Sequence, residues 1–263
     1  MIIEATTEPR ELTEQVRGLL EKYGKSAPPA WRVLQTPSET SGGLVLVPGW
    51  ILPETTPDES ILPLQPWRFE RRFQELRRMV EARTLEDVSM CRFSCLTDGD
   101  RMGLASVLYR EFDLAEWLTG STISSVTASI QGGCRANIVL CMSTGVVCGV
   151  EAGVTLPPGT AMIDRHELIA RRGVGCDRLV DSQVPQHSIY AFTADGTRQY
   201  TDTDSELFGL SGEAINLARA AYDALIRPES AAASRHQHRR LTQWVGLAFE
   251  SDRRCQRLER RGA

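Results

Sequence analysis

The chain lacks the long apolar runs that membrane-spanning helices need. Such a helix takes about 18 or more consecutive apolar residues, and no run of that length occurs among the 263 residues. The first residues, Met1-Ile2-Ile3-Glu4, have neither the basic start nor the apolar stretch of a secretory signal. We therefore expect a soluble, cytoplasmic protein with no membrane partner.

A strong excess of charge of one sign is absent too. The formal net charge is −4 and the pI is about 5.7. The arginines and histidines near the C-terminus are interleaved with Glu250, Asp252 and Glu259. Nucleic acids bind clustered basic surfaces, so we expect no nucleic-acid partner and interpret the basic tail as a solvated helix face.

The cysteines lack the spacing of a metal site or of a disulfide framework. There are seven, an odd number, and no two of them form a C-x2-C turn. Cys91 and Cys95 lie four apart in a strand-like segment, so both should face the same side of a sheet. We predict buried, reduced thiols, no zinc site and no cysteine nucleophile.

Glycine-rich phosphate loops and common hydrolase motifs are also missing. There is no G-x-G-x-x-G, P-loop or G-x-S-x-G pattern. The nearest string, Gly173-Val174-Gly175, lacks the third glycine and follows a segment that looks helical. In the pattern H-E-x-x-H, Ala170 stands where the second histidine would be. We expect no metal and no NAD(P) site within this chain.

What the sequence does contain is an ordered set of helix and strand signals. Helical spacing occurs at residues 8–23, 67–83, 108–118, 211–226 and 238–257, and strand-like alternation at 88–95, 121–131, 135–142, 146–152, 188–193 and 198–201. Tight turns separate several of the strands. The pattern predicts an α+β fold, an antiparallel sheet flanked by helices on one face, and not the alternating pattern of a nucleotide-binding sheet.

The segment 25–66 differs in composition from the rest. It holds eight prolines, which remove backbone donors and restrict φ. Only 44–47 could be a strand. We predict a largely irregular N-terminal part, 1–66, and an α+β domain, 67–263.

Several segments from Trp67 onward resemble one known family. The segment Phe112-Asp113-Leu114-Ala115-Glu116-Trp117-Leu118-Thr119-Gly120 is similar to its "IDLARWLLG" helix end, and residues 136–145 resemble its strand–turn "a.v.l.nG". The family is that of glucose–fructose oxidoreductase and inositol dehydrogenase (Gfo/Idh/MocA), and the likeness is to its C-terminal, substrate-binding domain. It implies a truncated member without most of the Rossmann domain, which associates through the open face of its sheet.

The chain departs from that family at the positions that carry its chemistry. On the resemblance, Ala5 stands at the catalytic lysine, Ser106 at the catalytic aspartate and Arg110 at the catalytic histidine. Arg83 and Glu86 replace two turn glycines. The resemblance therefore implies a degenerate active site.

Six residues are candidates for contacting a small-molecule ligand, because pockets need a few convergent polar groups. They are Arg92, Arg110, Arg165, His166, His187 and Tyr190. We interpret Asp164-Arg165-His166-Glu167-Leu168 as a surface turn that leads into a helix. A position of Arg165 and His166 at a cleft is the alternative.

Three functions remain open. The first is a non-redox subunit or ligand-binding oligomer, a dimer through the sheet face or a hetero-oligomer with a full-length homologue. The second is a cofactor-independent lyase, isomerase or cyclase acting on a sugar-like or biosynthetic small molecule. The third is a dehydrogenase completed by a partner chain.

Overall fold

The computed structural model describes residues 2–3, 45–51, 59, 61–177, 188–193, 196–201 and 212–260. The helix predicted at 8–23 lies outside them. The chain divides into two compact units. Unit 1 comprises Met1–Glu70 and Thr203–Thr242, and unit 2 comprises Arg71–Asp202 and Gln243–Ala263. The sequence-based division into 1–66 and 67–263 stays a prediction.

Unit 1 contains a small parallel sheet. Its strands are β1 (Ile2–Ile3), β2 (Val45–Pro48) and β3 (Ile61–Leu64), paired in that order. Helix α5 (Gly212–Ile226) supplies an alanine-rich face that includes Leu217, and this face packs against Leu46, Leu62 and Leu64 of the strands. The predicted helix at 211–226 and the predicted strand at 44–47 are confirmed.

The prediction that the rest of this proline-rich segment forms no regular element is wrong at β3. This strand contains Pro63, whose ring removes a ladder donor. β3 lies at the edge of the described sheet. The missing N–H of Pro63 therefore deprives no neighbouring strand of a hydrogen-bond donor. The Pro63 carbonyl accepts a hydrogen bond of 2.6 Å from Ser234 Oγ.

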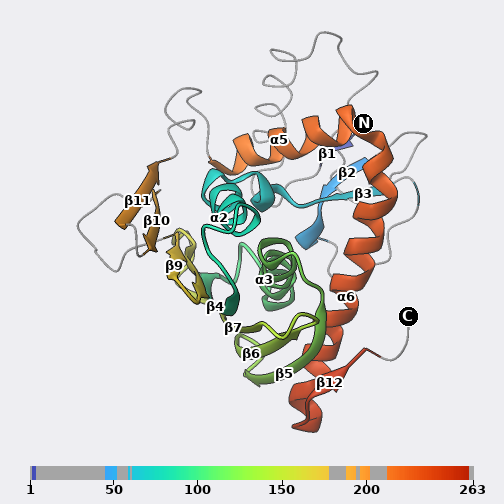
Figure 1. The fold of residues 1–263 in the computed structure, drawn as a ribbon. Coiled ribbons are helices and arrows are strands. Elements are labelled where there is room, and N and C mark those ends of the chain that lie inside the picture. Colours follow the sequence, from blue (N-terminus) through green and yellow to red (C-terminus); the bar gives the residue numbers. More distant parts are fainter. Residues whose placement is uncertain are drawn as a thin grey trace. The chain divides into compact units, whose positions relative to one another are not determined.

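Unit 2 is built on a nine-stranded sheet (Figure 1). The strand order is β11-β10-β9-β8-β4-β7-β6-β5-β12. The strands are β4 (Val88–Asp98), β5 (Ile123–Gln131), β6 (Arg135–Met142), β7 (Val147–Leu156), β8 (Ile163–Ala170), β9 (Gly173–Cys176), β10 (Ser188–Thr193), β11 (Gly196–Thr201) and β12 (Leu258–Glu259). The strands predicted at 88–95, 121–131, 135–142 and 146–152 and the hairpin 188–201 are confirmed.

The sheet is mixed, whereas the sequence predicted an antiparallel one. β4 and β7 run parallel, and the other pairs are antiparallel. The reason is the crossover: α3 (Leu104–Thr119) carries the chain from β4 to β5, and the hairpins β5-β6-β7 then lead back beside β4 in the same direction.

Helices α2 (Arg71–Glu81) and α3 lie against one face of this sheet. α3 contacts β4, β6 and β7, and α2 contacts β9, β10 and β11 (Figure 1). On this inner face Phe93, Ile138 and Val150 are buried, while Arg92, Val139 and Glu151 on the opposite face are exposed. The strand alternation predicted from the sequence therefore separates a covered inner face from an outer face.

The remaining helix, α6 (Ala231–Arg254), contributes its first part to unit 1 and its second part to unit 2. In unit 2 its Ser251 and Asp252 side chains accept hydrogen bonds from the backbone N–H groups of Ala128 and Ile130, at 3.0 and 2.7 Å. These contacts and the pairing of β12 with β5 close that edge of the sheet. None of the described helices combines the length and the apolar character needed to cross a membrane.

The end of α2 gives a test of backbone conformation. Arg83, exposed just after the helix, has a φ of 56°, in the left-handed region. A residue with a Cβ is strained there and glycine is not. Replacing Arg83 by glycine should raise the free energy of unfolding by about 0.5–1 kcal/mol in urea denaturation.

The matched control is Arg78→Gly within α2, which should lower the free energy of unfolding by about 1 kcal/mol. Arg83→Ala keeps the Cβ and should not reproduce the gain. Equal effects of the glycine and alanine substitutions at 83 would contradict the strain argument.

Candidate functional site

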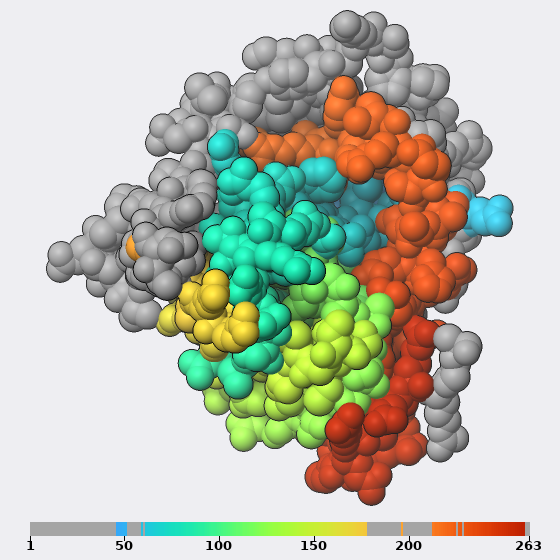
Figure 2. Space-filling view, viewed as in Figure 1, coloured from blue at the N-terminus to red at the C-terminus, as the bar shows by residue number. Residues whose placement is uncertain are grey.

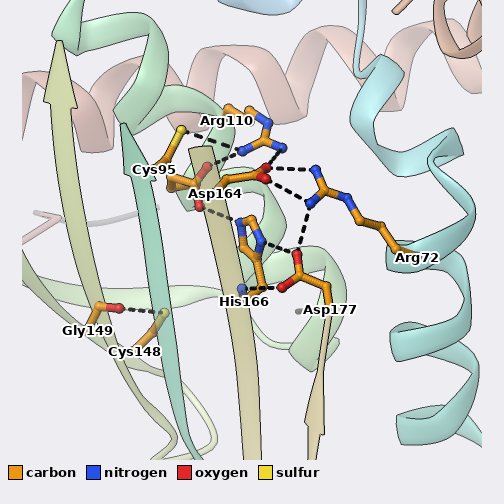
Figure 3. Close-up of polar contacts among 9 residues, drawn as sticks. Arg72, Cys95, Arg110, Cys148, Gly149, Asp164, His166 and Asp177 are labelled. Atoms are coloured by element: carbon orange, nitrogen blue, oxygen red, sulfur yellow. Dashed lines mark hydrogen bonds and ion pairs between the residues drawn. The ribbon is translucent and has the colours of Figure 1, made fainter. Parts of the chain in front are cut away.

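Between the helices and the inner face of the unit 2 sheet lies a cluster of ionisable side chains, the charged cluster (Figure 3). It consists of Arg72 from α2, Arg110 and Glu111 from α3, Asp164 and His166 from β8, and Asp177, which directly follows β9. Five of the six side chains are at most 3% exposed, and Arg72 is 16% exposed. α2 contacts β9, and Figure 2 shows the yellow residues of this part of the chain next to the blue-green ones that precede the sheet's central strands.

His166 is the centre of the charged cluster. Its Nε2 lies 2.8 Å from Glu111 Oε2 and its Nδ1 lies 2.7 Å from Asp177 Oδ2. The backbone N–H of His166 donates to the other oxygen of Asp177, at 2.7 Å. Both ring nitrogens face carboxylates, which only accept hydrogen bonds when ionised. The geometry therefore fits a doubly protonated imidazolium.

Two arginines converge on the carboxylate of Asp164. Arg72 donates to both of its oxygens, from Nη1 at 2.8 Å and from Nη2 at 2.7 Å. Arg110 Nη2 donates to Oδ2 at 2.6 Å, and its Nη1 donates to Glu111 Oε1 at 2.5 Å. A link from Arg72 to Asp177 at 3.1 Å joins this pair to the histidine. Such fork-shaped, charge-assisted hydrogen bonds are strong and geometrically specific.

Aromatic rings surround the histidine on the remaining sides. Phe73 and Phe93 meet the His166 ring edge to face, with centroids 4.7 and 4.9 Å away. The guanidinium groups of Arg72 and Arg110 also lie over Phe73, at 4.4 and 5.5 Å. Aromatic faces attract cations, so the rings exclude water and favour the positive charges.

The charges shift each other's protonation equilibria. Burial alone would lower the pKa of His166, but Glu111 and Asp177 outweigh it and raise the pKa to about 9. Burial would raise the pKa of Glu111, yet His166 and Arg110 hold it below its usual value. Likewise burial opposes ionisation of Asp164, and Arg72 with Arg110 brings its pKa well below the usual range. The cluster thus consists of three cations and three anions at neutral pH.

The structure brings only part of the predicted ligand residues together. Arg110 and His166 belong to the charged cluster. Arg92 is exposed on the outer face of the sheet, and Arg165 lies on that face and pairs with Glu167. Two further candidates are not placed: His187 lies outside the described residues, and Tyr190 is described only by its backbone in β10, opposite Cys176.

The interpretation of 164–168 as a surface turn leading into a helix is wrong. These residues form β8, which is paired with both β4 and β9. Asp164, His166 and Leu168 alternate toward the buried face. This period of two was present in the sequence, but the polar residues at the buried positions concealed it.

Sequence reasoning missed Arg72, Glu111, Asp164 and Asp177. Long arginine and glutamate side chains on helices are usually solvated, and no local spacing predicts that these are buried. One signal was available in the sequence: Asp164 and His166 are two residues apart, so in a strand both face the same side. Their partners are far away in the sequence and become evident only in the folded chain.

The predicted burial of the thiols is confirmed for Cys91, Cys95, Cys148 and Cys176. It is wrong for Cys255, which is exposed, and Cys134 and Cys141 are only half-buried. All seven are free, and Cys91, Cys95 and Cys148 are buried on the inner face. Burial, followed by the Glu111 charge, raises the pKa of Cys95, and burial with the neighbouring Cys91 raises that of Cys148. High thiol pKa values oppose nucleophilic reactivity. Among the described residues, no group of three or more histidine, cysteine or carboxylate side chains is arranged to hold a metal ion.

The glycine string 173–175 is part of β9 and follows a strand, not the helix expected. A Cβ at Gly175 would lie 2.7 Å from Leu85 Cδ1 and 3.1 Å from Leu76 Cδ2. This glycine therefore permits close packing of hydrophobic side chains.

Comparison with solved structures identifies the fold. The chain superposes on a protein from Sinorhizobium meliloti assigned as a myo-inositol dehydrogenase (14% identity, TM-score 0.66, 98% of each chain covered). It also superposes on an oxidoreductase from Agrobacterium radiobacter in complex with NAD+, L-tartaric acid and magnesium (12% identity, TM-score 0.62, 98% of this chain and 90% of that one). A protein of gentamicin A biosynthesis in complex with NAD is similar (11% identity, TM-score 0.66, 99% and 96%).

No protein-family model and no curated protein sequence matches the chain. The structural likeness shows that it has the fold of Gfo/Idh/MocA-type oxidoreductases, as the sequence resemblance implied. At this identity it establishes the fold alone.

The described strand ends of the parallel sheet in unit 1 do not fit a dinucleotide. A pyrophosphate binds where glycines let the backbone approach it at the start of a helix. β2 is followed instead by the short 3-10 turn Gly49–Ile51, and β3 by Gln65 and the 3-10 turn Pro66–Phe69. The buried rings of Trp50 and Trp67, 5.4 Å apart, fill these turns.

The charged cluster predicts how stability depends on pH. His166 has a pKa of about 9 in the fold and 6.5 as its ordinary value. Its stabilising contribution is therefore complete below pH 6.5 and is lost as the pH rises through 9. The difference corresponds to about 3 kcal/mol. Urea denaturation of the wild type should show this loss between the two pH values.

The variant His166→Gln removes the cation and leaves two buried carboxylates without it. It should be less stable by about 3 kcal/mol at neutral pH and should no longer show the loss toward pH 9. The exposed His236, changed to glutamine in the same way, should leave the wild-type profile intact. An unchanged pH profile in His166→Gln would contradict the assignment of the imidazolium.

Proposed function

We propose that this chain is a non-redox protein on an oxidoreductase fold, acting as a subunit or as a small-molecule-binding oligomer without its own NAD(P) site. The observation on which the proposal depends is the position and bonding of Arg110. It stands where the resemblance assigns the catalytic histidine, and its guanidinium is held by Asp164 and Glu111 in the closed charged cluster. We further infer that unit 2 corresponds to the substrate-binding domain of those enzymes.

A residue at that position in a dehydrogenase has to accept and return a proton beside the cofactor. Arginine does not do so, because its very high pKa keeps the guanidinium protonated at any working pH. Ser106 and Ala5, at the other two positions of the resemblance, are neutral and supply no charged acid or base either.

His166 does not replace the missing base. Its side chain is 0% exposed, both ring nitrogens are occupied by carboxylates, and the aromatic contacts of Phe73 and Phe93 cover the ring. A general base must come within hydrogen-bond reach of a substrate proton. Opening a side for a substrate would break a buried ion pair, at a cost of about 3–5 kcal/mol.

The NAD found in two of the similar structures favours a second candidate, a dehydrogenase that is completed by a partner chain. In that case the cofactor would be held by the partner, since the described strand ends of unit 1 do not fit it. The two candidates differ in one measurable property, binding and reduction of the cofactor.

Calorimetric titration of the purified chain with NAD(H) and NADP(H) should give no binding heat. Incubation with NAD+ and myo-inositol or L-tartrate should give no absorbance of reduced nicotinamide. A dissociation constant in the micromolar range would overturn the proposal. Turnover that needs a second protein would support the partner-completed dehydrogenase.

We also propose that the outer face of the unit 2 sheet is where two copies associate. Three of the five exposed large hydrophobic residues in the described part of the chain lie on it: Met90, Val139 and Ile163. Such residues gather at association surfaces. Arg92 and Glu151 lie on the same face, on the neighbouring strands β4 and β7, and neither has an ion pair among the described residues.

A two-fold axis through that face would place each Arg92 opposite the Glu151 of the second copy, so that both charges are matched. A stable interface of this kind should bury about 1,000 Å² or more in total. In a hetero-oligomer, a related chain would take the place of the second copy on the same face.

Light scattering should give about twice the chain mass of 29.2 kDa. Arg92→Glu and Glu151→Arg should each shift the protein toward monomer by placing like charges opposite each other. The double reversal should restore the dimer, whereas Arg78→Glu on α2 should have no effect. A wild-type monomer at micromolar concentration would contradict the proposal.

A further inference from the structure

We propose that Arg72 and Arg110 form a carboxylate-binding site that the chain fills with its own Asp164. The proposal goes beyond the function above and does not depend on it. The two guanidinium groups come from different helices, yet their donors meet on one carboxylate (Figure 3). This is the arrangement with which proteins bind a carboxylate ligand.

The hydrogen bonds resemble those of a bound ligand more than those of a single salt bridge. Arg72 Nη1 and Nη2 grip the two oxygens at 2.8 and 2.7 Å, as a fork. Arg110 Nη2 adds a third donor at 2.6 Å. The carboxylate of Asp164 is 2% exposed. Its place is therefore a preformed pocket for one carboxylate group, lined by donors.

The balance of charge in the charged cluster requires an anion at the position of the Asp164 carboxylate. With Asp164 the described members of the charged cluster are three cations and three anions. Removing Asp164 takes away the carboxylate on which both guanidinium groups converge, so the positive charge of Arg72 and Arg110 is less well compensated. A buried charge without a partner is strongly unfavourable, so a vacated site should bind a monoanion.

The arginines should keep their positions when Asp164 is truncated. Arg110 remains tied to Glu111 and Arg72 to Asp177, and both guanidinium groups lie over Phe73. Asp164 itself is supplied by β8, where its backbone is paired with Cys95 of β4. The donors are thus fixed independently of the carboxylate that they bind.

The size of the site sets the ligand class. Alanine at 164 retains the Cβ and vacates the volume of a carboxylate group, which matches formate. Glycine also vacates the Cβ, and the space then matches acetate. Arg72, the only member of the charged cluster that is more than 3% exposed, is on the side from which a small anion would enter.

The test measures thermal unfolding of Asp164→Ala in sodium formate and in sodium chloride of equal ionic strength. Formate should raise the melting temperature of this variant by about 3 °C or more over chloride at a formate concentration well above its dissociation constant. The wild type should respond equally to both salts. Asp164→Gly should respond to acetate more than Asp164→Ala does.

Two controls separate the site from general effects. In Asp164→Asn the asparagine side chain fills the volume of the aspartate, so no space is left for formate. This variant should be less stable than the wild type, and formate should not stabilise it. The second control is Asp98→Ala. Among the described residues, the Asp98 carboxylate accepts hydrogen bonds only from the backbone N–H groups of Asp100 and Gly159. Formate should therefore not stabilise this variant. Equal rescue of Asp98→Ala and Asp164→Ala, or none of Asp164→Ala, would overturn the proposal.

If Asp164→Ala does not fold in chloride, the readout becomes the yield on refolding from urea. A folded fraction in formate at least several-fold higher than in chloride supports the site. Equal failure in both salts, with Asp164→Asn folding, overturns it.

Discussion

The His166 imidazolium between Glu111 and Asp177 is the interaction on which the arrangement of unit 2 depends. It joins β8 to α3 and to the end of β9, and through Asp177 it is linked to Arg72 on α2. Buried ions are tolerated only when each is paired and fully hydrogen-bonded. A shift of any one of these elements would leave a charge without its partner, so their positions are coupled.

The same constraint separates the two faces of the sheet. On the inner face, polar groups that could have served chemistry are bonded to each other and covered by α2, α3 and two phenylalanine rings. On the outer face, Arg92 and Glu151 are unpaired within the described residues and lie among exposed apolar side chains. This difference between the faces supports the proposal that copies associate through the outer face, and it gives the inner cluster a structural role.

Most of the elements could be predicted because local pattern decides them. The apolar spacing of α3, which ends at Gly120, and the alternation of β6 hold whatever the rest of the chain does. Where prediction failed, tertiary context outweighed local preference. Pro63 is tolerated because β3 is at an edge, and residues 164–168 form a strand because β4 and β9 pair with both of its sides.

The sequence by itself determined the mixture of helices and strands and the burial of Cys91, Cys95, Cys148 and Cys176. It also identified Arg110 and His166 as residues to examine. Only the tertiary structure decided what they do. Glu111 and Asp164 lie beside them on α3 and β8, whereas Arg72 and Asp177 come from two further regions of the chain. Ion pairs between distant segments leave no periodic pattern in a sequence. The fold decides whether such charges face water or each other, because that depends on which surfaces it covers.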